Sequence, residues 1–120
     1  MPIHLQRGKI AEDKALAYLQ CNGLTLHQRN YRTPYGEIDL IMVDADLHEL
    51  IFVEVRFRVS DRFGGPAQSV DRRKQGKLIA SAEYFRQQNN RFIDSPCRFD
   101  VVTLSGGLEK GSLQWYRNAF

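Results

Sequence analysis

The spacing of hydrophobic residues along the chain predicts two helices. Between residues 8 and 22 the apolar positions recur every three or four residues, which is the spacing of one helix face. Gly23 follows at the position where a left-handed C-cap residue would end this helix. A second helix is predicted to begin near Asp71, whose side chain suits an N-cap, and to end near Asn89 and Asn90.

Strand patterns fill most of the remaining chain. Residues 24–31 alternate loosely between apolar and polar side chains, as a half-buried strand does. Two dense β-branched runs, residues 38–43 and 50–55, are predicted to form a hairpin at the centre of a sheet. Residues 99–104 predict a further strand, and residues 113–116 predict a short final one. The predicted fold class is α/β, with a mixed sheet flanked by helices in the order helix, three strands, helix, one or two strands.

Length and composition suit a single domain and restrict the class of partner only slightly. With 120 residues, 42% of them hydrophobic, the chain can bury one continuous core, and we expect one domain over residues 1–120. The 17 basic and 14 acidic residues and a pI near 9.0 favour a polyanionic partner weakly. Cys21 and Cys97 lack metal-ligand spacing, and no segment resembles a secretory signal or membrane span. We therefore expect a soluble, cytoplasmic protein with reduced thiols and no membrane partner.

The informative anomaly is charge inside the two dense apolar runs. Asp39 lies in the segment GEIDLI and Glu54 lies in the segment FVEVR. Charged groups in central strands require a compensating partner. A hairpin loop centred midway between the runs would place Asp39 opposite Glu54, and Glu37 opposite Arg56.

Two facing carboxylates suggest a metal site, but a structural alternative stays open. Like charges directly opposite each other destabilise a sheet unless a cation lies between them. Mg²⁺ or Mn²⁺ binds carboxylate oxygens and bridges to phosphate, so Asp39 and Glu54 could support phosphodiester hydrolysis. Alternatively, Arg56, Arg58 or a helix lysine neutralises both acids in a purely structural network. A register slip of one residue would send the two acids to opposite faces and remove the metal hypothesis.

Several motifs occur together along nearly the whole chain. They are Gly8, Glu12, Ala15, Tyr18-Leu19 and Gly23, then Arg29-Asn30-Tyr31-Arg32, GEIDLI, FVEVRFR, Lys74, Ala82, Arg98-Phe99-Asp100-Val101-Val102 and the terminal Asn118-Ala119-Phe120. In this combination the chain resembles the small bacterial YraN-type endonucleases of the PD-(D/E)XK nuclease superfamily, near the archaeal Holliday-junction resolvases. The resemblance implies a restriction-endonuclease-like fold and a metal-dependent endonuclease acting on DNA, including branched or structured DNA.

The resemblance also implies catalytic roles for three carboxylates. Asp39 matches the superfamily's metal-binding aspartate, Glu54 matches its second acidic ligand, and Glu12 matches the helix carboxylate that completes the cluster. From residue type alone, Glu12 could equally be an ordinary exposed helix residue.

One position departs from the family pattern, because Arg56 stands where a lysine is expected two residues after the glutamate. Lysine is a compact charge that can sit beside attacking water, whereas arginine is planar and effectively never deprotonates. Arg56 could still stabilise a negative transition state. Three interpretations stay open: Arg56 substitutes for the lysine, Lys74 or Lys77 supplies the charge, or the chain binds nucleic acid without cutting it.

Basic residues gather between the third predicted strand and the start of the second helix. Those predicted to bind nucleic acid, besides Arg56 at the site, are Arg58, Arg62, Arg72, Arg73, Lys74 and Lys77. Their position beside the carboxylates predicts a groove that follows the phosphate backbone rather than base edges. Without the carboxylates they would be read as a solvated helix face. The expected partner is nucleic acid, with DNA favoured by the resemblance, and a homodimer would suit a symmetric junction.

Overall fold

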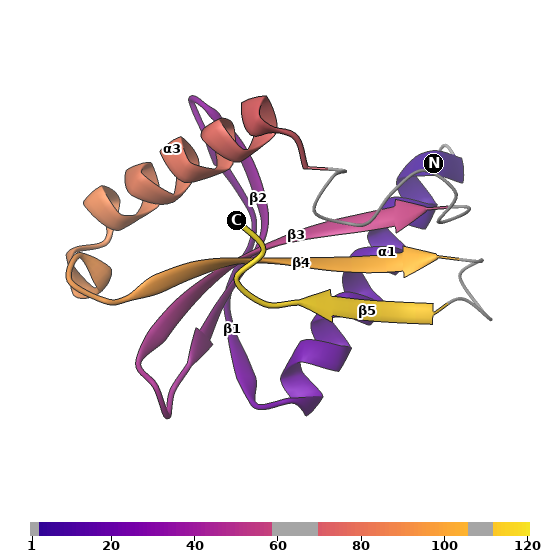
Figure 1. The fold of residues 1–120 in the computed structure, drawn as a ribbon, viewed down its shortest axis with the longest axis horizontal. Coiled ribbons are helices and arrows are strands. Elements are labelled where there is room, and N and C mark those ends of the chain that lie inside the picture. The colour runs from indigo at the N-terminus through magenta and orange to yellow at the C-terminus, as the bar shows by residue number, and fades with distance from the viewer. Residues whose placement is uncertain (1–2, 59–69, 106–111) are drawn as a thin grey trace.

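A computed structural model describes residues 3–58, 70–105 and 112–120 of the chain. These residues form α1 (Ile3–Cys21), β1 (Leu24–Thr33), β2 (Gly36–Asp44), β3 (Glu49–Arg58), α3 (Arg72–Gln88), the 3-10 helix η1 (Asn90–Phe92), β4 (Cys97–Ser105) and β5 (Ser112–Tyr116) (Figure 1). The predicted order of helices and strands is confirmed, including the short final strand. The differences are that α1 begins before Gly8 and that η1 was not predicted.

The strands form one five-stranded mixed sheet in the order β1-β2-β3-β4-β5. The β3–β4 pair is parallel, and the other three pairs are antiparallel. A parallel pair requires a crossover connection, and α3 lies in the segment that joins β3 to β4. The β2–β3 hairpin therefore lies inside the sheet, as predicted, with β3 as the central strand.

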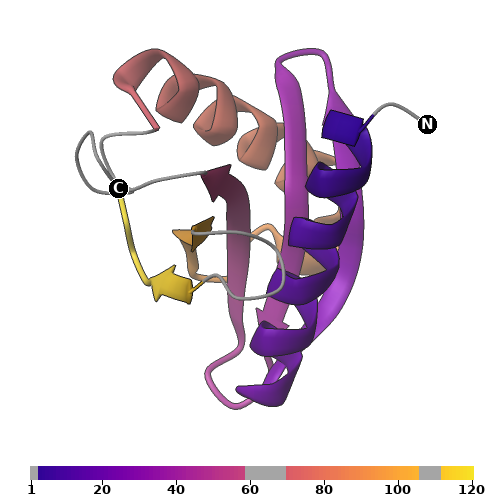
Figure 2. The same cartoon turned by 90° about the vertical axis from the view of Figure 1, so that its right-hand side faces the viewer.

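The two helices cover opposite faces of the sheet (Figures 1 and 2). Successive side chains of a strand point to opposite faces, and neighbouring residues of β3 accordingly pack in two separate hydrophobic clusters. In one cluster α1 contributes Ala11, Ala15 and Leu19, and in the other α3 contributes Leu78, Ala82 and Phe85. Of the helices that the structure describes, neither is long and apolar enough to cross a membrane.

The predicted residues at the end of α1 and at the start of α3 are confirmed. Gly23 has φ +93°, a conformation that non-glycine residues rarely adopt, directly after α1 ends. Asp71 is the N-cap of α3, and its side chain accepts a hydrogen bond from the backbone N–H of Lys74 at 2.9 Å. This cap fixes the first turn of α3 at the edge of the candidate site described next.

Candidate metal and nucleic-acid site

The candidate site begins where β2 separates from β3. The ladder between β2 and β3 begins with Asp44 opposite Glu49 and ends with Leu40 opposite Val53, in the predicted register. Asp39 is the next residue of β2 beyond this last pair. Ile38 and Leu40 lie two residues apart yet pack in different clusters, on the α3 and α1 faces respectively. Side chains two apart in a regular strand share a face, so β2 must rotate about Asp39. Asp39 and Glu54 therefore lie just beyond the last pair of the ladder, and the predicted pairing between them is not part of it.

The carboxylate of Asp39 is partly buried against the neighbouring strand. Its Oδ2 accepts a hydrogen bond from the backbone N–H of Val55 at 2.8 Å. Burial, followed by the nearby negative charge of Glu54, raises the pKa of Asp39 to about 7, although the Val55 bond and Lys74 oppose the rise. Near neutral pH this carboxyl group is therefore protonated in part of the molecules. A bound cation could take the place of the proton and relieve the repulsion between Asp39 and Glu54.

Glu54 is more deeply buried than Asp39, at 5% exposure, but it has basic partners. Its Oε1 lies 2.9 Å from Nζ of Lys74 and 3.3 Å from Nε of Arg56. The structural alternative raised from the sequence is therefore realised for Glu54, which a helix lysine and Arg56 neutralise. For Asp39 the observed hydrogen bond comes from a backbone amide instead.

A pocket of about 550 Å³ lies over the two acids, between the sheet and α3. On its strand side it is lined by Gly36, Glu37, Asp39 and Glu54. On its helix side it is lined by Asp71, Arg73, Lys74, Lys77, Leu78 and Ser81. One wall thus carries three acidic side chains and the other three basic side chains beside Asp71, an arrangement that can hold a cation and an anion side by side.

The structure brings some of the predicted nucleic-acid-binding residues to the pocket and leaves others outside it. Those that line it are Arg73, Lys74 and Lys77. Arg72 is exposed on the same turn of α3. Arg56 contacts Glu54 but is not one of the described residues that line the pocket. Arg58 pairs through its backbone with Ser105 at the end of β3, and Arg62 lies outside the described residues.

Glu12 is connected to this site indirectly. Its Oε1 lies 3.4 Å from Nε of Arg29. The Asn30 carboxamide, oriented with its nitrogen toward the acids, donates to Glu12 Oε1 at 3.1 Å and to Glu37 Oε1 at 3.0 Å. Burial raises the pKa of Glu12 against the lowering effect of Arg29, and its charge contributes to the raised pKa of Asp39. Glu12 thus does not line the pocket, but Asn30 connects it to Glu37, and its charge acts on Asp39.

The residues at the pocket fit a cation that takes most of its ligands from outside the protein. Within residues 3–58, 70–105 and 112–120 there is no group of three His, Cys, Asp or Glu side chains that could hold a metal ion by themselves. Asp39 and Glu54 supply carboxylate oxygens beside an open volume. Mg²⁺ keeps several waters and binds through one or two carboxylates and substrate phosphates, so this donor set suits it.

Sequence reasoning missed three residues of the pocket. Glu37 was expected to face Arg56, but the pairing of β2 with β3 ends at Leu40, and Glu37 pairs with Arg32 on β1. Its acidic side chain in the same segment, GEIDLI, is the signal that could have indicated it. Asp71 was recognised only as a helix cap. Ser81 gave no sequence signal, and its hydroxyl lies 2.8 Å from Oγ1 of Thr33, linking α3 to the turn between β1 and β2.

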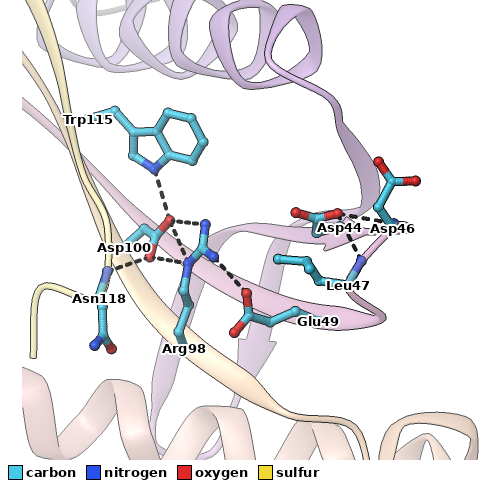
Figure 3. Close-up of polar contacts among 8 residues, drawn as sticks. All are labelled: Asp44, Asp46, Leu47, Glu49, Arg98, Asp100, Trp115 and Asn118. Carbon is cyan, nitrogen blue, oxygen red and sulfur yellow. Dashed lines mark hydrogen bonds and ion pairs between the residues drawn. The ribbon is translucent and has the colours of Figure 1, made fainter.

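A second buried carboxylate, Asp100 on β4, has a different environment (Figure 3). Arg98 donates to both of its oxygens, at 3.0 and 3.2 Å. Nε1 of Trp115 donates at 2.8 Å and the backbone N–H of Asn118 at 2.9 Å. Arg98 also contacts Glu49 at 2.6 Å, which connects β4 to β3. Four donors surround Asp100, so this network joins the C-terminal strands and differs from the open pair at the pocket.

Comparison with known proteins identifies the family. Residues 11–104 match the model of a family described as "Uncharacterised protein family UPF0102". A UPF0102 protein of Pseudomonas fluorescens is 47% identical over 117 residues, covering 98% of this chain and 94% of that protein. A UPF0102 protein of Pseudomonas entomophila is 50% identical over 114 residues, covering 94% and 91%.

Among solved structures, Pyrococcus furiosus SfsA in complex with Ca²⁺ matches 91% of this chain and 59% of its own chain at 14% identity. Its TM-score of 0.36 is too low to support any conclusion about this protein. The family model matches most of the chain, and the relatives cover nearly all of it. The chain therefore belongs to the UPF0102 family, which is the YraN-type family that its motifs resemble.

Proposed function

We propose that the chain is a divalent-metal-dependent endonuclease of the PD-(D/E)XK type that hydrolyses phosphodiester bonds in DNA. The observation that supports this function is the proximity of Asp39 and Glu54, on neighbouring strands, at a pocket whose opposite wall carries Arg73, Lys74 and Lys77. Carboxylates on one side suit a metal ion, and ammonium and guanidinium groups on the other suit phosphates. An ordinary structural ion-pair network would not need the open volume between them.

The residues at the pocket suit the parts of a hydrolytic reaction. Asp39 and Glu54 would hold Mg²⁺ or Mn²⁺, and the bound ion would neutralise phosphate charge and lower the pKa of water. In hydrolysis, a water oxygen forms a bond to phosphorus while the bond from phosphorus to one sugar oxygen breaks. One hydrogen of the water ends on the departing sugar oxygen, and the other passes to solvent from the new phosphate monoester. Arg73 and Lys77 would position the phosphate backbone across the pocket.

The same surface suggests the kind of substrate. Arg73 and Lys77 lie on one exposed helix turn, which can contact successive phosphates without reading bases. Such contacts favour recognition of DNA shape, and the resemblance to junction resolvases favours branched or structured DNA. A homodimer would present two such pockets to the two equivalent strands of a symmetric junction.

The direct test compares cleavage by the wild-type protein with cleavage by Asp39→Asn and Glu54→Gln. Duplex, single-stranded and four-way-junction DNA are incubated with each protein in Mn²⁺ or Mg²⁺, with chelator as the control. We expect metal-dependent cleavage that falls at least about 100-fold in each variant, because each removes a charged ligand oxygen. Circular dichroism shows that the variants remain folded. Absence of cleavage on every DNA form would overturn the proposal.

A second function, DNA binding without cleavage, is favoured by one observation. Lys74 and Arg56 already neutralise Glu54, so the site is partly satisfied without a metal ion. This function predicts salt-sensitive DNA binding that is unaffected by chelation and by Asp39→Asn. Loss of binding on chelation alone would count against it.

A further inference from the structure

Two cations contact the same oxygen of Glu54, but they occupy different environments. Lys74 extends from the first turn of α3, its side chain is 40% exposed, and it lines the pocket. The Arg56 side chain is 26% exposed and extends from β3 itself. Its Nε is buried and has no hydrogen-bond partner within the described part of the chain, because the 3.3 Å contact with Glu54 lacks hydrogen-bond geometry. Of these two cations, only Lys74 combines contact with Glu54 and access to the pocket volume.

We infer that Lys74 is the catalytic cation of this site and contacts the phosphate that reacts, whereas Arg56 supports Glu54 from behind the pocket. This inference rests on the proposed function. It gives Lys74, a helix residue, the catalytic role that a cation at the strand position of Arg56 would otherwise have. The geometry that carries it is the 2.9 Å contact of the ammonium with Glu54 at the pocket wall.

The anchoring of Lys74 suits this role. Its backbone N–H is held by the Asp71 side chain at 2.9 Å, and its ammonium is held by Glu54 at 2.9 Å. Both ends of the residue are therefore positioned before substrate arrives, which reduces the reorganisation needed in the transition state. An ammonium group carries three N–H donors, so it can contact Glu54 and still donate to a phosphate oxygen.

A purely structural role for Lys74 makes different predictions. If the ammonium served only to neutralise Glu54, its removal would destabilise the fold or change metal affinity, while the rate of the chemical step would stay the same. If it contacts the reacting phosphate, its removal lowers kcat. Kinetics and metal binding must therefore be measured together on the same proteins.

The experiment measures kcat and KM for DNA cleavage, together with Mn²⁺ affinity by calorimetry in the absence of DNA. The variants are Lys74→Gln, Lys74→Arg, Arg56→Gln and Arg56→Lys. Lys14→Gln, which removes an exposed positive charge on α1 at the opposite face of the sheet, is the charge-matched control. We expect Lys74→Gln to lower kcat about 100-fold or more, without weakening Mn²⁺ binding and with little change in KM.

The companion variants make the result specific. Lys74→Arg should retain more activity than Lys74→Gln, because it keeps a positive charge at the pocket. Arg56→Gln should lower kcat less than Lys74→Gln, and Arg56→Lys should not raise it. A Lys74→Gln protein with kcat within about fivefold of wild type, or a rise in kcat with Arg56→Lys, would overturn the inference alone. Absence of cleavage by the wild-type protein would overturn the proposed function and the inference with it.

Discussion

The backbone N–H of Val55 donates a 2.8 Å hydrogen bond to Oδ2 of Asp39, beyond the point where the ladder between β2 and β3 has ended. A side-chain carboxylate thus takes over a contact between the two strands. This contact keeps Asp39 close to Glu54 even though like charges repel each other. The repulsion between the two carboxylates raises the free energy of the folded protein, and binding of a proton or a metal ion can reduce it.

We predict that the metal-free protein loses stability as the pH rises from about 4 to about 7. Folding raises the pKa of Asp39 from 3.8 to about 7, so the folded state binds the proton more tightly than the unfolded state does. The folded state is favoured most below pH 4, and this advantage disappears as the pH approaches 7. At about 1.4 kcal/mol per pKa unit, the loss is at most about 4 kcal/mol. Urea unfolding in chelator across this pH range measures it.

Asp39→Asn is the matched control for the pH prediction. An asparagine oxygen can still accept the Val55 hydrogen bond, but the side chain does not ionise. The variant should match the wild type in stability near pH 4 and exceed it increasingly up to about pH 7. A stability difference between the two proteins that is independent of pH would show that Asp39 does not titrate near neutrality.

We predict that asparagine at position 100 destabilises the fold, whereas asparagine at position 39 does not. Asp100→Asn removes a buried carboxylate that accepts hydrogen bonds from Arg98 and Trp115. Breaking a buried ion pair typically costs about 3 kcal/mol or more. Urea unfolding at pH 7 should show a loss of this size, and calorimetry should show unchanged Mn²⁺ affinity. A stable Asp100→Asn protein that has lost Mn²⁺ binding would contradict the division into a structural and a functional acid.

We predict that the basic wall of the pocket sets the salt dependence of DNA binding. In the Asp39→Asn background, where we expect no cleavage, Arg73→Gln and Lys77→Gln should each reduce the salt slope for duplex binding by about 0.9, the value for one phosphate contact. Fluorescence anisotropy at several salt concentrations measures the slope. Lys14→Gln should leave the slope unchanged, and an equal effect of all three variants would indicate general attraction rather than contacts at the pocket.

Several features of the site could be predicted because their causes are local in the chain. The N-cap at Asp71 depends on the backbone N–H three residues later, and the turn at Gly23 depends on its own φ. The register of β2 and β3 follows from the short loop between them, since the pairing of Asp44 with Glu49 defines every pair up to Leu40 with Val53. The predicted pairs of Asp39 with Glu54 and of Glu37 with Arg56 were wrong because they assumed that the ladder continued past Leu40, where β2 in fact rotates.

The sequence by itself determined that charged residues lie within hydrophobic strands. Asp39, Glu54 and Asp100 all have this position in the sequence. It held no information on which of them faces open space. The tertiary structure decided that, because the packing of α3 leaves a pocket above two of the acids, while Trp115, Arg98 and the chain at Asn118 surround the third. It also brought Lys74 to Glu54 from twenty residues along the chain. Spacing rules describe neighbours along one element, whereas a pocket forms only where separate elements fail to fill the space between them.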